Sequence, residues 1–245
     1  MAFHYSPNVT TDGLILYMDP INTKSYPGTG LTWSDISGLV HTYNGNIGGT
    51  LSSVTYNSTS NSFDTNAIFA TQSNNISCGA ITFADAGEYT LDFWVKLRTG
   101  ITTNYSNTIF GNGIPSSSLV TLNTLSGISW QITFISNTGL TQYYWSPIND
   151  YDLINNWVNI TLVFKSNRNI DFYLNGVYKQ TVIPTNTSFY INKIASGYNS
   201  GAAPTIYNPL QGSISATKIY NRALKATEVD RNYKALSSRF GLYSI

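Results

Sequence analysis

Few side chains in this sequence can act as an acid, a base or a nucleophile. The only histidines are His4 and His41, and neither has a carboxylate or a cysteine nearby at the spacing of a catalytic triad or a metal site. The only cysteine is Cys78, so the chain can form neither an intrachain disulfide nor a thiolate zinc site, which fits folding in a reducing cytoplasm. Glu88 and Glu228 are the only glutamates and are far apart in the sequence. The sequence therefore predicts a protein that is not an enzyme.

One pair of aspartates has a spacing that could support acid–base chemistry. Asp150 and Asp152, in "INDYD", would lie on the same face of an extended strand. Aspartate is also a common turn residue, because its carboxylate accepts hydrogen bonds from nearby backbone amides. We favour the turn interpretation for both residues.

Aromatic side chains give a second kind of candidate site. The stretch "TQYYWSPINDY" brings Tyr143, Tyr144 and Trp145 close together, and Trp94 lies on the polar face of a predicted strand, where it is placed to line the concave sheet. Aromatic rings surrounded by amides and hydroxyls form sugar-binding platforms. The alternative is that these aromatics pack at a sheet edge or in a subunit interface, and we favour that interpretation over a sugar platform.

The elements that must position these residues are mostly strands. Apolar and polar residues alternate over 89–97, 128–134 and 158–164, which predicts strands with one buried face. Residues 170–174 continue the pattern up to Asn175-Gly176, a dipeptide that favours a type I′ turn and therefore predicts a hairpin. The residues expected in the core between two sheets are Trp130, Phe134, Phe164, Phe172 and Leu174.

The C-terminal region departs from this pattern. After "GSISATKIY" the apolar residues Ala226, Val229, Tyr233 and Leu236 recur three or four positions apart, which predicts a helix that starts between residues 224 and 228. Residues 1–87 are less regular, with strands expected at "GLILYMD" and "SFD" and a turn at "TWSDISG" around Asp35. The alternation predicts an all-β, two-sheet antiparallel jelly-roll sandwich with a short C-terminal α-helix. We expect residues 1–12 to form an N-terminal arm and residues 13–245 to form a single domain.

The charge composition argues against two classes of partner. Charged residues make up 10% of the chain and the net charge is +1, so no field attracts nucleic acid or an anionic membrane. The sequence has no signal peptide and no apolar run of membrane-spanning length, which predicts a protein made in the cytoplasm. Low charge with many amides and aromatics suits a protein that forms a homo-oligomer or a multi-copy assembly.

Several segments, in a fixed order, resemble one known family. They are "GLILYMDPINTKSYPGTGLTWSDISG", "YTLDFWVKL", "WVNITLVF", "IDFYLNGVY" and "LQGSISATKIYNRALKATEVDRNYKALSSRFGL". Together they resemble the concanavalin A-like lectin/glucanase superfamily, in the laminin-G-like form found in virion proteins of tailed bacteriophages. The resemblance implies a concanavalin A-like sandwich whose C-terminal helix packs on its edge.

The resemblance also implies what to look for at the site. Glucanases of this superfamily place Glu-x-Asp-x-Glu on one strand, and two isolated glutamates cannot form that motif. Related domains often bind calcium between an N-terminal segment and the last strand, but Ser215 stands here where many relatives have aspartate. Asp19 and Asp35 are the remaining candidate ligands and serve equally well as turn residues, so we leave the metal unassigned and expect no cofactor other than calcium.

Three functions follow from the resemblance, in decreasing order of support. The first is a non-catalytic virion structural protein, in capsid decoration or in a tail or fibre, that contacts other virion proteins and glycans. The second is an adhesin module that binds host glycans. The third, a glycoside hydrolase, is opposed by the glutamate count. In the first two, the sugar site would involve Trp145 with Tyr143 or Tyr144, or the face around Trp94.

Overall fold

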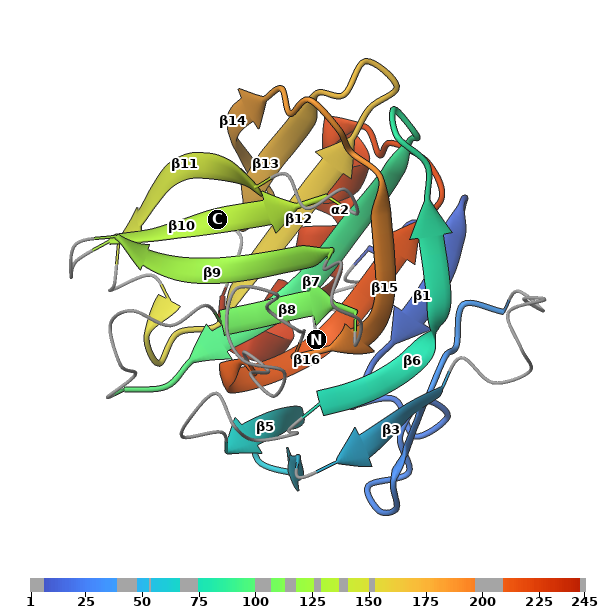
Figure 1. Cartoon of the computed structure of the whole chain (residues 1–245). Coiled ribbons are helices and arrows are strands. Elements are labelled where there is room, and N and C mark those ends of the chain that lie inside the picture. The colour runs from blue at the N-terminus through green and yellow to red at the C-terminus, as the bar shows by residue number, and fades with distance from the viewer. Residues whose placement is uncertain are drawn as a thin grey trace, which may run out of the picture.

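The computed structural model describes residues 7–38, 48–52, 54–66, 75–99, 107–112, 118–125, 129–136, 141–149, 153–196 and 209–242. Their strands form two antiparallel sheets that pack face to face (Figure 1). This arrangement confirms the all-β sandwich that the alternation predicted.

The first sheet, here called sheet A, has the strand order β14-β13-β12-β7-β16-β5-β4, and β1 pairs with β16 beside β5. Its strands are β1 (Leu14–Met18), β4 (Thr55–Asn57), β5 (Ser62–Asn66), β7 (Tyr89–Leu97), β12 (Val158–Phe164), β13 (Ile170–Leu174), β14 (Val177–Val182) and β16 (Gln211–Tyr220). The predicted strands at "GLILYMD" and "SFD" are β1 and β5.

The second sheet, sheet B, has the order β11-β10-β9-β8-β15-β6-β3-β2. Its strands are β2 (Thr32–Ser34), β3 (Gly48–Ser52), β6 (Asn75–Phe83), β8 (Asn107–Gly111), β9 (Leu119–Leu125), β10 (Ser129–Ile135), β11 (Thr141–Asn149) and β15 (Phe189–Ile194). Part of the predicted "TWSDISG" turn is thus strand β2. The turn follows it at Asp35, whose carboxylate accepts hydrogen bonds from the amides of Tyr17 and Ser37.

The core between the sheets contains the residues that strand parity placed there. Trp130, Phe134, Phe164 and Phe172 are at most 3% exposed, and Leu174 is partly buried against them at the end of its strand. Aromatic rings stack across the layer, because the ring centroid of Phe83 on β6 of sheet B lies 4.0 Å from that of Tyr89 on β7 of sheet A. The alternation of these strands therefore predicted which face of each strand is buried.

The β13–β14 hairpin turns at the predicted dipeptide. Asn175 and Gly176 have φ values of 51° and 75°, the left-handed conformation that a type I′ turn requires. Gly176 also packs against the C-terminal helix, and a Cβ there would lie 3.0 Å from the Cβ of Tyr233. Both constraints favour glycine at this position.

Strand β6 was not predicted from the sequence, and its register explains why. Ile76 and Ile81 are both buried in the core although they are five residues apart, an odd separation that breaks strict alternation. The pairing with β15 shifts register between Ile191 and Lys193, which marks an irregularity in the ladder. A search for period-2 alternation misses such a strand.

The C-terminal helix α2 (Ala226–Ser237) starts within the predicted window and continues into the 3₁₀ helix η1 (Ser238–Phe240). Val229 and Leu236 are buried as predicted, but Ala226 is exposed because it is the first residue of the helix and lies beside an open groove. The helix covers the outer face of sheet A and not, as the resemblance implied, the edge of the sandwich, because Leu236 packs against Trp94 on the central strand β7 (Figure 1). In the described part of the chain, no helix is long and apolar enough to span a membrane.

The start of α2 is fixed by one carboxylate. Glu228 accepts a hydrogen bond from the backbone amide of Lys225 at 2.8 Å and pairs with the guanidinium of Arg222 at 2.7 Å. The hydrogen bond from Arg222 is the main reason that the pKa of Glu228 falls from 4.5 to about 2. Lys225 itself has no side-chain acceptor for a helix amide, so the acid supplies the only side-chain capping of this turn.

Replacing Phe172 with alanine should lower the free energy of unfolding by about 3–5 kcal/mol, because it removes a core side chain and leaves a cavity. Chemical denaturation of both proteins measures this. Val177→Ala, on the exposed adjoining strand, serves as the control and should change stability little. An unchanged midpoint for Phe172→Ala would contradict the strand register.

Acid should remove the stabilisation that Glu228 contributes. Its pKa is depressed in the folded state, so the contribution is complete above pH 4.5 and disappears as the pH falls towards about 2. The melting temperature of Glu228→Gln should lie below that of the wild type at pH 6, and the difference should shrink between about pH 4.5 and 2. A gap that stays constant over this range would show that the carboxylate charge contributes nothing.

Candidate functional site

The predicted aromatic platform lies at an edge of the sandwich. Tyr143, Tyr144 and Trp145 belong to β11, the edge strand of sheet B, and the backbone register pairs Tyr143 with Thr133 and Tyr144 with Ile132. The side chains of β11 lie outside the described residues, as do Asp150 and Asp152. The platform and the turn assignment of the two aspartates stay predictions.

Trp94 does not line an open face, and that expectation is wrong. Its side chain points to the outer side of sheet A as strand parity predicted, but it is 0% exposed. Its ring stacks on Phe240 at 4.1 Å and on Tyr233 at 5.7 Å between centroids, so η1 and α2 cover it. The apolar surface that a sugar could have used is buried by the protein's own helix.

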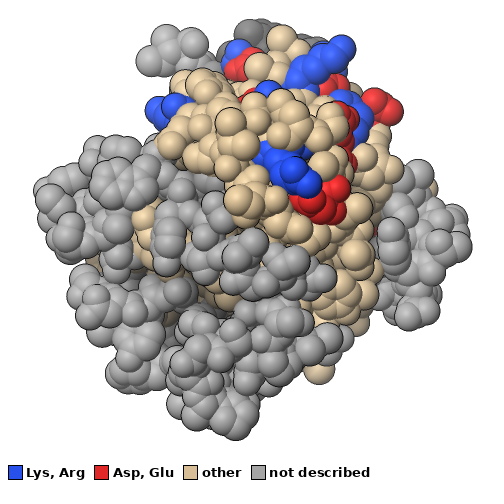
Figure 2. Space-filling model, turned by 45° about the horizontal axis from the view of Figure 1, so that its top comes forward, with Lys and Arg blue, Asp and Glu red and all other residues tan. Residues whose placement is uncertain are grey.

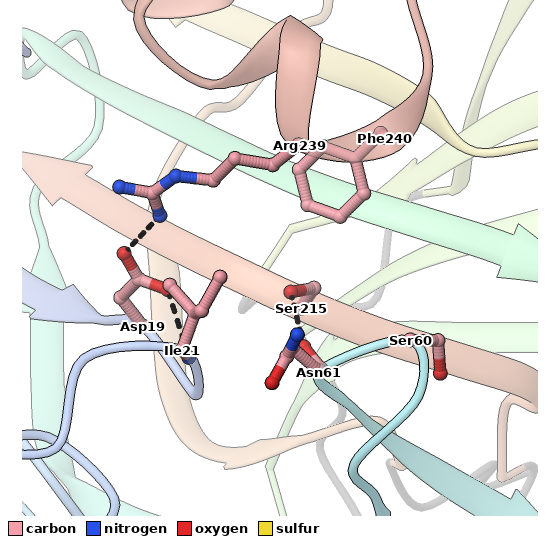
Figure 3. Close-up of a pocket in the computed structure, with 7 residues that line it drawn as sticks. All are labelled: Asp19, Ile21, Ser60, Asn61, Ser215, Arg239 and Phe240. Atoms are coloured by element: carbon pink, nitrogen blue, oxygen red, sulfur yellow. Dashed lines mark hydrogen bonds and ion pairs between the residues drawn. The ribbon is translucent and has the colours of Figure 1, made fainter.

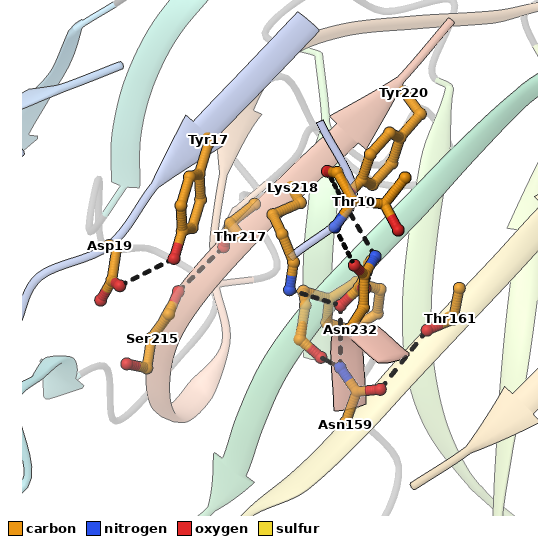
Figure 4. Close-up of polar contacts among 12 residues, drawn as sticks. Thr10, Tyr17, Asp19, Asn159, Thr161, Ser215, Thr217, Lys218, Tyr220 and Asn232 are labelled. Atoms are coloured by element: carbon orange, nitrogen blue, oxygen red, sulfur yellow. Dashed lines mark hydrogen bonds and ion pairs between the residues drawn. The ribbon is translucent and has the colours of Figure 1, made fainter. Parts of the chain in front are cut away.

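A buried ion pair lies beside Trp94 under the same helix. The ammonium of Lys218 on β16 is 3.2 Å from the carboxylate of Asp92 on β7, and both side chains are fully buried. Asp92 also accepts hydrogen bonds from the side-chain amides of Asn159 on β12 and Asn232 on α2, at 2.8 and 3.1 Å. Figure 4 shows Lys218, Asn159 and Asn232 pointing toward one another from different elements. The charges are therefore paired and hydrogen-bonded, as buried charges must be.

The N-terminal segment is tied into this network. The amide of Thr10 donates to Asn232 at 2.8 Å, and the Thr10 carbonyl accepts a hydrogen bond from the hydroxyl of Tyr220 at 3.1 Å (Figure 4). Val9 packs against the cluster around Trp94. Deleting residues 1–12 would therefore break buried contacts, and Val9 and Thr10 act as part of the domain rather than as a free arm.

A small hollow opens beside the middle of β16, lined by Asp19, Ile21, Ser60, Asn61, Ser215, Arg239 and Phe240 (Figure 3). Asp19 is 2% exposed, and its carboxylate is 2.6 Å from the Arg239 guanidinium and 2.9 Å from the Tyr17 hydroxyl. The Ser215 hydroxyl donates to the Asn61 carbonyl at 3.0 Å. Burial, followed by the charge of Asp19, raises the pKa of Tyr17, which keeps its hydroxyl a donor to the carboxylate.

The hollow does not fit the calcium ion that the family resemblance suggested. The positive charge beside Asp19 is supplied by Arg239, and Ser215 offers no charge. Asp35 does not face Asp19, because its carboxylate is bonded to the backbone of Tyr17 and to Ser37. Within the described residues, no group of three His, Cys, Asp or Glu side chains could hold a metal ion.

The described strands also lack the carboxylate arrangement of a glycosidase. The strands of sheet B contain no aspartate or glutamate as far as they are described, and the described strand carboxylates of sheet A are Asp64, Asp92 and Asp171, each on a different strand. Asp92 is neutralised by Lys218, and Asp171 is paired with Lys165 at 2.5 Å. No two of these carboxylates share a strand, so the described strands carry no Glu-x-Asp-x-Glu arrangement.

A wider groove, here called the α2 groove, lies between the β12–β13 turn and the segment that leads into α2. It is lined by Glu88, Lys165, Ser166, Asn167, Asp171, Tyr173, Ala223, Leu224, Lys225 and Ala226. The groove was not predicted from the sequence, because its walls come from segments about 50 residues apart. Asp171 and Tyr173 fall on the polar side of the strand that became β13. This alternation is the one feature of the sequence that could have indicated the groove.

Comparisons with known proteins agree with this architecture. A family model described as the concanavalin A-like lectin/glucanases superfamily matches residues 69–230. No curated protein sequence matches the chain significantly. The family match covers more than half of the chain and includes both β7 and the strands that form the hairpin.

Similar solved structures include two of the receptor-binding domain of botulinum neurotoxin type G, with TM-scores of 0.54 and 0.58 and identities of 20% and 22%. Another is the ligand-binding domain of botulinum neurotoxin serotype D in complex with N-acetylneuraminic acid, with a TM-score of 0.58 and 15% identity. The matches cover 91–92% of this chain but only 51% of each of those chains. The chain thus spans about half their length, and at these identities the likeness shows the fold alone.

Removing the arginine should expose the charge of Asp19. Arg239→Ala leaves a nearly buried carboxylate without its cation, so the melting temperature should fall, whereas Lys234→Ala on the exposed side of α2 should have little effect. Calcium or EDTA should not change the melting temperature of the wild type. A calcium-dependent rise in the wild type would contradict the assignment of Arg239 as the cation of this hollow.

Proposed function

Because the chain belongs to the concanavalin A-like lectin/glucanase superfamily, we propose that it is a non-catalytic, lectin-like binding module that contacts glycans. The observation that carries the proposal is the arrangement of its carboxylates. Glycoside hydrolysis needs two carboxyl groups about 5–9.5 Å apart on either side of the scissile bond. The described strand carboxylates stand on three different strands, and two of the three are engaged by lysines.

The surface chemistry supports contact with carbohydrate. Neutral hydroxyl and amide groups replace charge over most of the chain, since charged residues make up only 10%. Figure 2 shows acidic and basic side chains interspersed at one end of the visible face, without a broad area of one sign among the described residues. A related fold in the serotype D neurotoxin domain was solved with N-acetylneuraminic acid, which makes sugars the class of ligand to test first.

We place this module in a bacteriophage particle, as a capsid decoration or as a tail or fibre component. The support is the resemblance of the segments "NTKSYPGTGLTWSDISG", "IYNRAL" and "SRFGL" to virion proteins of tailed phages. In that setting the protein is made in the host cytoplasm, is present in many copies and contacts other virion proteins. Exposed apolar side chains such as Leu31 and Ile183, 66% and 72% exposed, provide contact area for such neighbours.

Purified particles of the phage that encodes this chain should contain the polypeptide, as quantitative mass spectrometry of the virions would show. The recombinant protein should bind immobilised glycans and release no sugar from them. Particles that lack the polypeptide would exclude the virion assignment. Sugar release that a point change in this chain abolishes would exclude a non-catalytic role.

A further inference from the structure

The α2 groove offers room for a ligand and fixed polar groups, and an exposed aromatic ring outside its lining, that of Tyr178, contacts the lining residue Tyr173. We infer that this groove binds a neutral pyranose residue of a glycan, with Tyr178 as its stacking platform. The inference rests on the proposed glycan-binding function and names the site and the class of sugar.

Tyr178 supplies the aromatic surface beside the groove. Its side chain is 51% exposed, so part of the ring is accessible to a ligand. It packs against Tyr173, a groove residue, with the ring centroids 5.7 Å apart and the rings at an angle of 74°. The Tyr178 hydroxyl shares a hydrogen bond of 2.9 Å with Thr181. The ring is therefore held in place before any ligand binds, and its free face suits the apolar C–H face of a pyranose.

Fixed polar groups continue from this ring into the groove. Thr181 donates to Asp171 at 2.5 Å, and Asp171 pairs with Lys165 at 2.5 Å, so Tyr178, Thr181, Asp171 and Lys165 form one connected set. Asp171 is nearly buried while Lys165 is 40% exposed, so the pair presents a carboxylate acceptor beside an ammonium donor. A lysine ammonium has three protons, and a pair of this kind matches two neighbouring sugar hydroxyls.

The charges of the groove select the kind of sugar. Glu88 and Asp171 contribute two negative charges and Lys165 and Lys225 contribute two positive charges, so the lining is neutral overall. A neutral lining has no net attraction for an anionic sugar. We therefore assign the groove to neutral hexoses or N-acetylhexosamines and not to sialic acid.

Binding to a glycan array that carries matched neutral and sialylated oligosaccharides tests the inference. The variants are Tyr178→Ala, Asp171→Asn, Trp145→Ala and a control, Ile183→Ala, which shortens an exposed side chain outside the groove lining. The wild type and Ile183→Ala should bind neutral glycans equally. Tyr178→Ala should weaken binding about tenfold or more, as expected for the loss of a stacking aromatic. Thermal melting checks that each variant is folded.

The outcomes separate this inference from the proposed function. Neutral-glycan binding that Tyr178→Ala and Asp171→Asn leave unchanged would overturn the α2 groove as the site, and loss in Trp145→Ala alone would move the site to β11. In both cases glycan binding itself stands. A preference for sialylated over matched neutral glycans would overturn the assignment to neutral sugars. A folded wild type that binds no glycan would overturn both the inference and the proposed function.

Discussion

The buried ion pair between Asp92 and Lys218 is the interaction on which the organisation of this domain depends. Two fully buried charges are tolerated only when they are paired and their remaining hydrogen-bonding capacity is used, and removing one partner of such a pair typically costs about 3–5 kcal/mol. Asn159 and Asn232 complete the bonding of Asp92, and Asn232 in turn holds the amide of Thr10. The central strands of sheet A, helix α2 and the N-terminal segment must therefore be in place together, which favours one docking of the helix over others.

That docking decides which surfaces remain for ligands. With α2 over the centre of sheet A, Trp94 becomes a packing residue, stacked on Phe240. The same 3₁₀ turn that delivers Phe240 also directs Arg239 to Asp19. One short C-terminal segment, η1, thus covers part of the outer face of sheet A and also supplies the cation of the neighbouring hollow. The family resemblance predicted the fold correctly. It did not predict the lining of the hollow, because part of that lining comes from side chains at the end of the chain.

Local patterns predicted the regular parts of this structure because they depend on neighbours in the sequence. The alternation of β7, β12 and β13 identified the buried faces, Asn175-Gly176 identified the hairpin, and the apolar spacing identified the helix to within its predicted window. Strand β6 was missed because a register irregularity places Ile76 and Ile81 on the same side against strict parity. Parity also put Trp94 on the outer face correctly, but which face a residue occupies says nothing about what covers that face. The contact between Asp19 and Arg239 joins residues 220 positions apart, and no local rule reaches that far.

Helix α2, which covers the outer face of sheet A, also contributes to the wall of the α2 groove. Its first residue, Ala226, is exposed because the apolar stripe of α2 meets the sheet only from Val229 onward, and the chain entering the helix stands away from the β12–β13 turn. The gap between them is the α2 groove, and its polar wall is Asp171 with Lys165. The position of the groove follows from where the helix starts, which Glu228 fixes through the amide of Lys225. The ion pair under the helix and the cap at its start therefore set the shape of the surface that is left for a ligand.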